Sequence, residues 1–481
     1  MSVLKISRCL NKLSIFSFVN KSNENFIFTQ YFGNAHKKTD NLCPSFLFFI
    51  VLNLGQAFWK IKEVFMYKEF EKRINDENSE KIIKLTEDLN ICLDKKDSFS
   101  VGRFCVKETI GITRSEIVID GLGKQINVEI KNCTSSDFCL FYIHPSARDI
   151  LLTNLTIKIR IKNPDDTSRL FTAIYNTAYG VKMQNCRIEI VSDKHINLYA
   201  IYNNGNLDTH LETRADNLVI DNCLIKVDSR SEEPERDCKV FGLYNNMANS
   251  LSLQNTFIYS TVNGNSEKQK AIGVYTSGRF GRFVGNNIKA NGCHNKGRQK
   301  EQPTAIGFVN EGQYSLITSN NIVGEWAGIA IGLENRGEFV SVATNKILAT
   351  HTICGRSIRN YAQKSTFTNN IITSTSRNAR LFELNSSNCV ISHNIMQVLM
   401  SFDACRSGCA VYVAQNSVGN IITENVFKNV LDCGIFAERE AGFIANNRLD
   451  SYLETREIAD RTNKTLLEKL DEKNIISIPN E

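Results

Sequence analysis

Acidic side chains in several polar segments of this 481-residue chain are the groups that most directly suggest chemistry. Two carboxylates ~5 Å apart can hydrolyse a glycoside with retention, and two ~9 Å apart with inversion. Carboxylate oxygens are also ligands for Ca²⁺, so the same acids could hold that ion. Neither chemistry is specific here, and no catalytic residue is assigned. The acids, with one histidine among them, are Asp165, Asp166, Asp193, His195, Asp228 and Glu232.

Most of these polar segments immediately precede a short phrase that contains a tyrosine. Because strands alternate faces, the apolar residue before each tyrosine is predicted to point inward, with the tyrosines and the Ala/Gly residues outside. We therefore expect Tyr175, Tyr202, Tyr244, Tyr275 and Glu334 to line a binding surface, with the polar segments forming one wall. Stacking for stability alone is the competing interpretation. The phrases are Ala173-Ile174-Tyr175-Asn176, Ala200-Ile201-Tyr202-Asn203, Gly242-Leu243-Tyr244-Asn245, Gly273-Val274-Tyr275-Thr276, Gly307-Phe308-Val309-Asn310 and Gly332-Leu333-Glu334-Asn335.

The elements that must position these side chains repeat along the chain. Ile347, Ile371 and Ile395 are 24 residues apart and each follows an Asn-containing turn. The segments between such turns are short, alternating and rich in β-branched residues, which predicts strands and a turn of parallel β-helix per repeat. An Asn at a fixed turn position can hydrogen-bond its equivalents above and below. The turns include Gln184-Asn185-Cys186, Asp221-Asn222-Cys223, Asn320-Asn321-Ile322 and Asn369-Asn370-Ile371.

The repeated phrase resembles the right-handed parallel β-helix superfamily of pectate lyases, polygalacturonases and phage tailspikes. The resemblance covers roughly residues 67 to 450. It includes Ile117-Val118-Ile119-Asp120-Gly121-Leu122-Gly123, which is similar to an early turn of that family. It implies an all-β solenoid of about 11 to 13 coils with a short N-terminal capping helix, and a substrate cleft on an outward sheet. Such marks specify fold far more than chemistry.

The chemistry of the resembled enzymes is not assembled in this sequence. The motif Arg160-Ile161-Lys162 precedes Asp165-Asp166, which is the wrong order for a polygalacturonase, and no Gly-His-Gly occurs. Asn176-Thr177-Ala178 has alanine where the acid belongs. The sequence therefore predicts polysaccharide binding and leaves cleavage open. A non-enzymatic structural or interaction protein of tailspike or adhesin type is the alternative.

The first 65 residues differ from the rest of the chain. They hold 8 Lys/Arg against 3 Asp/Glu, which leaves the remainder with 49 against 48. The body thus has no basic excess, and nucleic acid is not an expected partner. We expect residues 1 to 65 to be translated upstream DNA, or a signal or anchor around residues 43 to 59, with Met66 as the bacterial or phage start. A chain starting at Met66 would be cytoplasmic without stable membrane insertion, and one using the signal would be exported or anchored.

The two remaining expectations concern the C-terminal end and the cysteines. Residues 451 to 481 are predicted to form a helical cap and tail over the last coil. The 15 cysteines show no CxxC pair and no metal-ligand spacing, so no metal or other cofactor is expected apart from the Ca²⁺ alternative. Cys133, Cys186 and Cys223 follow turn residues and should be buried and reduced. The oligomeric state is not predicted.

Overall fold

A computed structural model gives the structure of the protein. It describes residues 66–94, 100–101, 104–105, 110–131, 137–162, 170–205, 215–230, 237–264, 266, 268–292, 303–352, 354–376, 378–399, 407–430, 433–438, 442–450 and 476–477. The chain divides between Lys62 and Glu63 into two units, and the described residues belong to the second. The expectations for residues 1 to 65 and for the C-terminal helix therefore lie outside the described residues.

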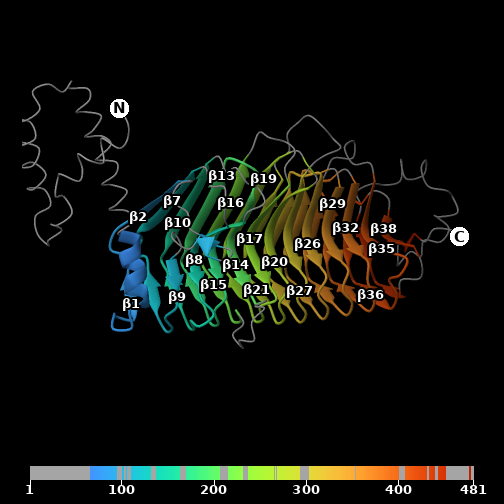
Figure 1. Ribbon diagram of the computed structural model, residues 1–481. Coiled ribbons are helices and arrows are strands. Elements are labelled where there is room, and N and C mark those ends of the chain that lie inside the picture. Colours follow the sequence, from blue (N-terminus) through green and yellow to red (C-terminus); the bar gives the residue numbers. More distant parts are fainter. Residues whose placement is uncertain are drawn as a thin grey trace, which may run out of the picture. The chain divides into compact units, whose positions relative to one another are not determined.

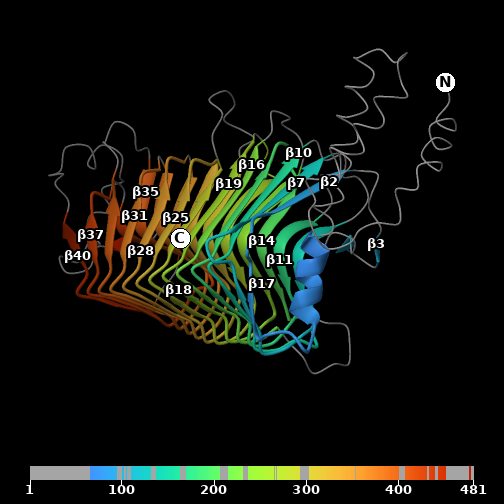
Figure 2. The same cartoon turned by 90° about the vertical axis from the view of Figure 1, so that its left-hand side faces the viewer.

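The described unit is a parallel β-helix in which each coil contributes one strand to each of three sheets (Figures 1 and 2). Each sheet has 13 strands, and neighbours within a sheet come from successive coils. All pairings within these three sheets are parallel, so every strand lies directly above the strand one coil earlier. The all-β, right-handed parallel β-helix predicted from the repeat is confirmed, with the expected number of coils.

The first sheet consists of short strands, most of three residues. Each strand alternates faces, with its middle residue buried in the three-residue strands. In order, the strands are β1 (Ile82–Lys84), β6 (Val118–Asp120), β9 (Leu151–Thr153), β12 (Lys182–Gln184), β15 (Val219–Asp221), β18 (Ser252–Gln254), β21 (Arg282–Val284), β24 (Leu316–Thr318), β27 (Ser341–Ala343), β30 (Thr366–Thr368), β33 (Val390–Ser392), β36 (Asn420–Thr423) and β39 (Gly442–Ala445).

The second sheet follows the first after a tight turn in each coil. Its early strands alternate strictly, because one face packs on the core and the other faces outward. The strands are β2 (Leu89–Asp94), β7 (Gln125–Lys131), β10 (Thr156–Lys162), β13 (Arg187–Ser192), β16 (Leu224–Arg230), β19 (Phe257–Asn263), β22 (Asn287–Asn291), β25 (Asn321–Glu325), β28 (Lys346–Thr350), β31 (Ile371–Ser374), β34 (Ile395–Val398), β37 (Val426–Lys428) and β40 (Arg448–Asp450).

The third sheet carries the tyrosine phrases and has the longest strands. Most of its side chains are buried, including many that point away from the core. The strands are β5 (Ile110–Ile112), β8 (Phe138–Ile143), β11 (Leu170–Asn176), β14 (Asn197–Asn204), β17 (Cys238–Asn246), β20 (Gln269–Thr276), β23 (Thr304–Asn310), β26 (Ile329–Asn335), β29 (Cys354–Asn360), β32 (Asn378–Leu384), β35 (Ser407–Val413), β38 (Cys433–Ala437) and β41 (Ile476–Ser477).

A helix at residues 66–75 covers the N-terminal end of the solenoid, as predicted (Figure 2). Its apolar residues Tyr67, Phe70 and Ile74 are at most 4% exposed and join the main core. Strands β3 (Ser100–Val101) and β4 (Phe104–Cys105) form a small antiparallel pair beside the coils. Among the described residues, no helix is long and apolar enough to cross a bilayer.

Two ladders of buried asparagines hold the turns together. In the turn between the first and second sheets, the Asn345 amide donates to Ile317 O, Ala343 O and Asn370 Oδ1 at 2.8, 2.9 and 3.0 Å. The same contacts recur in successive coils, so the predicted Asn ladder is confirmed. The first ladder contains Asn286, Asn320, Asn345, Asn370, Asn394, Asn425 and Asn447, and the second, at the end of the third sheet, contains Asn176, Asn203, Asn245, Asn310, Asn335 and Asn360.

The small residues of the tyrosine phrases lie inside the solenoid, so their predicted outward position is wrong. A Cβ on Gly307 would lie 2.7 Å from Gly332 O and 2.7 Å from Ile322 Cγ2 of the second sheet. Gly307 and the next residue, Phe308, therefore both face the core, and the strict alternation of the strand breaks at this position. The third sheet needs small residues here because the second sheet approaches closely.

Candidate functional site

The tyrosines of the third sheet form an outward column in exact register. Tyr142, Tyr175, Tyr202, Tyr244 and Tyr275 pair across successive strands β8 to β20. Neighbouring ring centroids are 5.9, 5.0, 4.8 and 4.6 Å apart in that order. The column continues without a gap through six further strands as Val309, Glu334, Arg359, Glu383, Tyr412 and Phe436.

The tyrosine rings are less exposed than expected, because each covers its neighbour. Tyr175 is only 6% exposed, and Tyr202, Tyr244 and Tyr275 are half-buried. Tyr244 and Tyr275 are nearly parallel, at 9°, so their facing surfaces are already occupied. Burial, with the nearby Tyr202 and Glu311 oxygens, raises the pKa of Tyr244 to about 12. The column therefore presents ring edges and neutral phenolic hydroxyls to a ligand.

A second outward column runs beside the tyrosines and is apolar in its middle. Tyr199 stacks on Phe241 at 4.9 Å and 9°. Phe241, Ile272, Ile306 and Ile331 follow one another in register and are 2 to 8% exposed. Together with Val309 and the adjoining tyrosines they form a cluster separate from the main core. This apolar strip gives the face an apolar floor between the aromatic and ionic parts.

The ionic part of the face occupies strands β26 to β32. Glu334 lies 2.6 Å from Arg336 and 3.8 Å from Arg359, and it is 4% exposed. Glu383 lies 2.6 Å from Arg356 and 3.6 Å from Arg359. Each glutamate thus accepts contacts from more than one guanidinium.

This network contacts aromatic residues at both of its ends, through a hydrogen bond at one end and a cation–π contact at the other. Tyr275 Oη donates to Glu311 at 2.7 Å, and Glu311 is bound by Arg336 at 3.1 Å. At the other end Arg380 lies 3.8 Å above the ring of Tyr412, whose hydroxyl contacts Glu438. One polar network therefore connects the tyrosine column to Tyr412.

The ionic network keeps its central carboxylate charged. Burial acts to raise the pKa of Glu383, but the charges of Arg359 and Arg356 and the bonds from Asn385 and Arg356 outweigh it, so the pKa lies below its usual value. A general acid needs the opposite shift. Glu383 can accept hydrogen bonds from a ligand, but it is unsuited to protonating a leaving group.

Only some residues of the predicted acidic wall belong to the part of the chain that the structure describes. Asp165, Asp166 and Glu232 lie outside the described residues. Asp193 is exposed in the turn before β14, whereas Asp228 on β16 is 5% exposed and held by Arg230 at 2.6 Å. Across the described ranges, no group of three His, Cys, Asp or Glu side chains has metal-binding geometry, so nothing there supports the Ca²⁺ alternative.

His195 is placed in the interior instead of on the wall of a cleft. It is 1% exposed, and its Nδ1 lies 3.4 Å from Ser229 Oγ and 3.7 Å from Cys238 Sγ. Burial raises the pKa of the Cys238 thiol to about 12, so this thiol stays protonated near neutral pH and is a poor nucleophile. Cys186 and Cys223 are buried, as predicted, and form no disulfide in the structure, while Cys133 lies outside the described residues.

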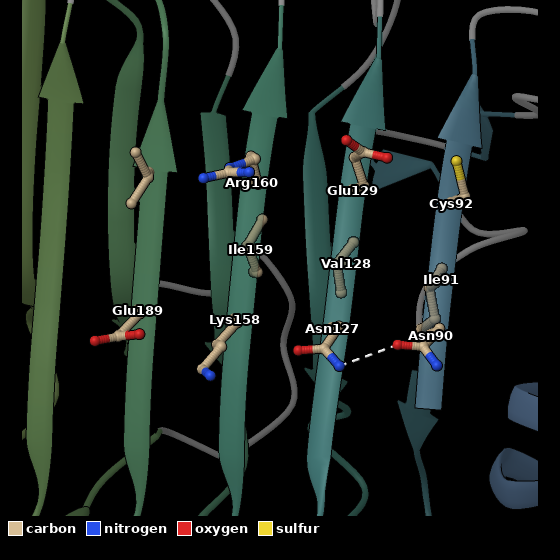
Figure 3. A pocket seen from close by; sticks show the side chains of 11 residues that line it. Asn90, Ile91, Cys92, Asn127, Val128, Glu129, Lys158, Ile159, Arg160 and Glu189 are labelled. Atoms are coloured by element: carbon tan, nitrogen blue, oxygen red, sulfur yellow. Dashed lines mark hydrogen bonds between the residues drawn. The ribbon is translucent and has the colours of Figure 1, made fainter. Parts of the chain in front are cut away.

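A separate hollow of about 450 Å³ lies on the outward face of the second sheet (Figure 3). One row of its lining is Asn90, Asn127, Lys158 and Glu189, and the next is Cys92, Glu129 and Arg160. Glu129 is already bound by Lys162 at 2.5 Å and Lys131 at 2.9 Å, which lowers its pKa. This open hollow is lined by side chains of both charges, and its lining residues do not form a cluster of reactive groups. The third sheet therefore remains the better candidate site.

Most of the ionic network and the whole apolar column were not among the residues predicted from the sequence. Extending the tyrosine phrase by its own register past Glu334 would have reached Ile358-Arg359 and Phe382-Glu383. The apolar column could not be found, because strict alternation placed Tyr199 and Phe241 out of phase with the tyrosines. Arg356 was missed because of this phase, and Tyr412 because the phrase was not extended. Glu311 was missed because it lies in the turn after β23 and not in a strand.

Comparison with known proteins shows similarity only at the level of solved structures. No family model and no curated protein matches the chain. The A-module of the mannuronan C-5 epimerase AlgE6 from Azotobacter vinelandii is 10% identical, with a TM-score of 0.36, covering 78% of this chain and 91% of that one. PfbA, a surface adhesin of Streptococcus pneumoniae, is 11% identical, with a TM-score of 0.37 and coverage of 78% and 88%.

A third similar structure is a tailspike mutant of Escherichia coli bacteriophage HK620 in complex with a pentasaccharide. It is 11% identical, with a TM-score of 0.33, covering 77% of this chain and 65% of that one. These values assign no activity to this chain. The function has to be argued from its own outward face.

Proposed function

We propose that this protein binds an extended polysaccharide along the outward face of the third sheet. The observation that carries the proposal is the unbroken column from Tyr142 to Phe436, which changes from aromatic to ionic without leaving its register. Adjacent positions repeat every ~4.8 Å, so the column offers periodic contacts to a periodic chain. A polymer with repeating hydroxyls suits such a surface better than a compact ligand.

The contacts offered by the aromatic part are hydroxyls and amides on an apolar floor. Asn204 donates to Tyr175 Oη at 2.9 Å, and Asn246 donates to Asn204 at 3.0 Å, so amides border the tyrosine column. Rings stacked on one another have little free surface for a sugar to stack on. Recognition is therefore assigned to hydrogen bonds from the phenols and to contacts with the ring edges.

The direct test compares two tyrosine-to-phenylalanine changes in a glycan array with the full chain. Tyr244→Phe removes the phenolic hydroxyl that is proposed to contact the ligand but keeps the ring in its stack. It should weaken binding by roughly 0.5 to 1.5 kcal/mol. Tyr314→Phe is the matched control, because Tyr314 is also a stacked ring but lies in a turn next to the first sheet. This control should bind like the unaltered protein.

A reducing-end assay on every glycan that binds separates binding from cleavage. Release of new reducing ends would add an enzymatic activity to the proposed binding function. If no glycan of a broad panel binds, the proposal is wrong and the structural or interaction alternative takes its place. Equal losses in both phenylalanine variants would likewise remove the third sheet as the binding face.

A further inference from the structure

The charged groups that follow the tyrosine column along the outward face of the third sheet balance one another. Within the part of this face that the structure describes, the columns from Glu311 to Glu438 carry four arginines and four glutamates. Two lysines lie outside these columns, Lys239 and Lys270, which are the second residues of β17 and β20. The arginines are Arg336, Arg356, Arg359 and Arg380, and the glutamates are Glu311, Glu334, Glu383 and Glu438.

Glu383 is the centre of this balance, because it contacts three arginines. Arg356 Nε and Arg359 Nε lie 2.6 and 3.6 Å from one oxygen of Glu383, and Arg380 Nη1 lies 4.0 Å from it. The Arg356 and Arg359 side chains are 15% and 22% exposed. An incoming carboxylate or sulfate would have to displace Glu383, or lie beside Glu383 and Glu334 and be repelled.

A neutral sugar hydroxyl meets no such obstacle at this surface. It can donate to a carboxylate oxygen of Glu383 or Glu334 and accept from a guanidinium N–H that the ion pair leaves open. Charged hydrogen-bonding groups contribute more than neutral ones, so a paired Arg and Glu row can bind uncharged hydroxyls well. The arrangement that excludes anions therefore favours neutral chains.

Building on the proposed function, we propose that the bound polysaccharide is uncharged and that Glu334 and Glu383 exclude chains bearing carboxylate or sulfate groups. Exclusion of this kind is specificity by repulsion, since the arginines would otherwise form an anion site. The low pKa of Glu383 supports the proposal, because its negative charge persists at neutral pH.

The first experiment uses the full, unaltered chain and needs no variant. Binding is measured for neutral galactomannan and dextran, for polygalacturonate and its carboxyl-reduced neutral form, for heparin, and for neutral and acidic glycans of the array. We expect the glycans that bind to be neutral and their affinities to change less than about twofold between low and high ionic strength. Binding confined to anionic chains and lost at high salt would overturn the proposal while leaving polysaccharide binding intact.

The second experiment removes the repulsive charge. Glu383→Gln leaves the three arginines without their shared carboxylate and should raise affinity for polygalacturonate or heparin roughly tenfold or more at low salt. If Glu383→Gln does not fold, Glu334→Gln tests the same point. Glu129→Gln is the control, because it makes the same change in net charge on the second sheet, where Glu129 is held by two lysines.

The outcomes of the two experiments are separable. Gain of anion binding in the third-sheet variants, absent from Glu129→Gln, supports the proposal. Equal gains in all three variants show a general charge effect and overturn it, as does the absence of any gain in folded third-sheet variants. If neither neutral nor anionic glycans bind the unaltered chain, the proposed function fails and this inference fails with it.

Discussion

At the scale of single residues, Tyr244 has a structural role and a proposed binding role, and different substitutions separate the two. Its ring lies between Tyr202 and Tyr275. It also makes an edge-to-face contact with Phe241, with the ring centroids 5.0 Å apart. The hydroxyl belongs to the surface that a ligand would meet. The sequence predicted the position and the stacking of this tyrosine, but it could not give the ring's burial, which depends on the neighbouring column.

Truncation of Tyr244 should therefore cost stability as well as binding. We expect Tyr244→Ala to lower the free energy of unfolding by about 1 to 2 kcal/mol, because several ring contacts are lost from a half-buried site. Leu243→Ala should cost about 2 to 5 kcal/mol, because Leu243 is fully buried in the main core. Urea unfolding measures both. A larger loss for Tyr244→Ala than for Leu243→Ala would contradict the assigned faces.

Glu383 should make the free energy of unfolding depend on pH in the acidic range. A carboxyl whose pKa is lowered by folding stabilises the native state above its unfolded pKa of about 4.3, and this contribution is lost as the pH falls towards the folded value. We therefore expect the stability difference between the unaltered chain and Glu383→Gln to be largest near neutral pH and to shrink below about pH 4.3. A difference that stays constant over this range would show that the arginines do not stabilise the charged form.

At the scale of elements, the repeat predicted the coils well and the third sheet incompletely. The Asn turns fix one point in every coil, and short alternating strands between them leave few other folds. Which residues of the third-sheet strands face inward could not be predicted from the turns in the same way. Gly307 and Phe308 both face inward there, because the second sheet lies too close for a larger residue at position 307.

Gly307→Ala tests this close approach. Its Cβ would lie 2.7 Å from a backbone oxygen of the next coil, which cannot move without disturbing the sheet. We expect a loss of roughly 1 to 3 kcal/mol in thermal or urea unfolding, as for other overpacked interiors. Ala305→Gly is a useful comparison, because it removes a buried methyl from the same strand without adding a contact. An unchanged stability for Gly307→Ala would contradict the inward position of the small residues in the tyrosine phrases.

At the scale of the whole molecule, the fold was predictable from the sequence and the function only in outline. A solenoid repeats its pattern many times, so errors at single turns do not change the architecture. The proposed binding surface is instead assembled from side chains on successive coils, such as Tyr275, Glu311 and Arg336, which are far apart in the sequence. Only the register between strands brings them together.

The N-terminal boundary remains a proposal with a simple test. The helix at residues 66–75 supplies Tyr67, Phe70 and Ile74 to the main core, so a chain of residues 66 to 481 contains the whole described cap. We expect it to unfold within a few degrees of the full chain in a thermal scan. A marked loss of stability or solubility would show that the first 65 residues support the solenoid.

The most direct test of the account is a crystal structure of the full chain with the oligosaccharide that binds best in the glycan array. We predict a neutral chain lying along the third sheet, with its hydroxyls contacting the Tyr202 to Tyr275 column and reaching the arginine and glutamate rows near Glu334. A sugar seated in the hollow beside Arg160 on the second sheet, or an anionic group on Arg359, would contradict it.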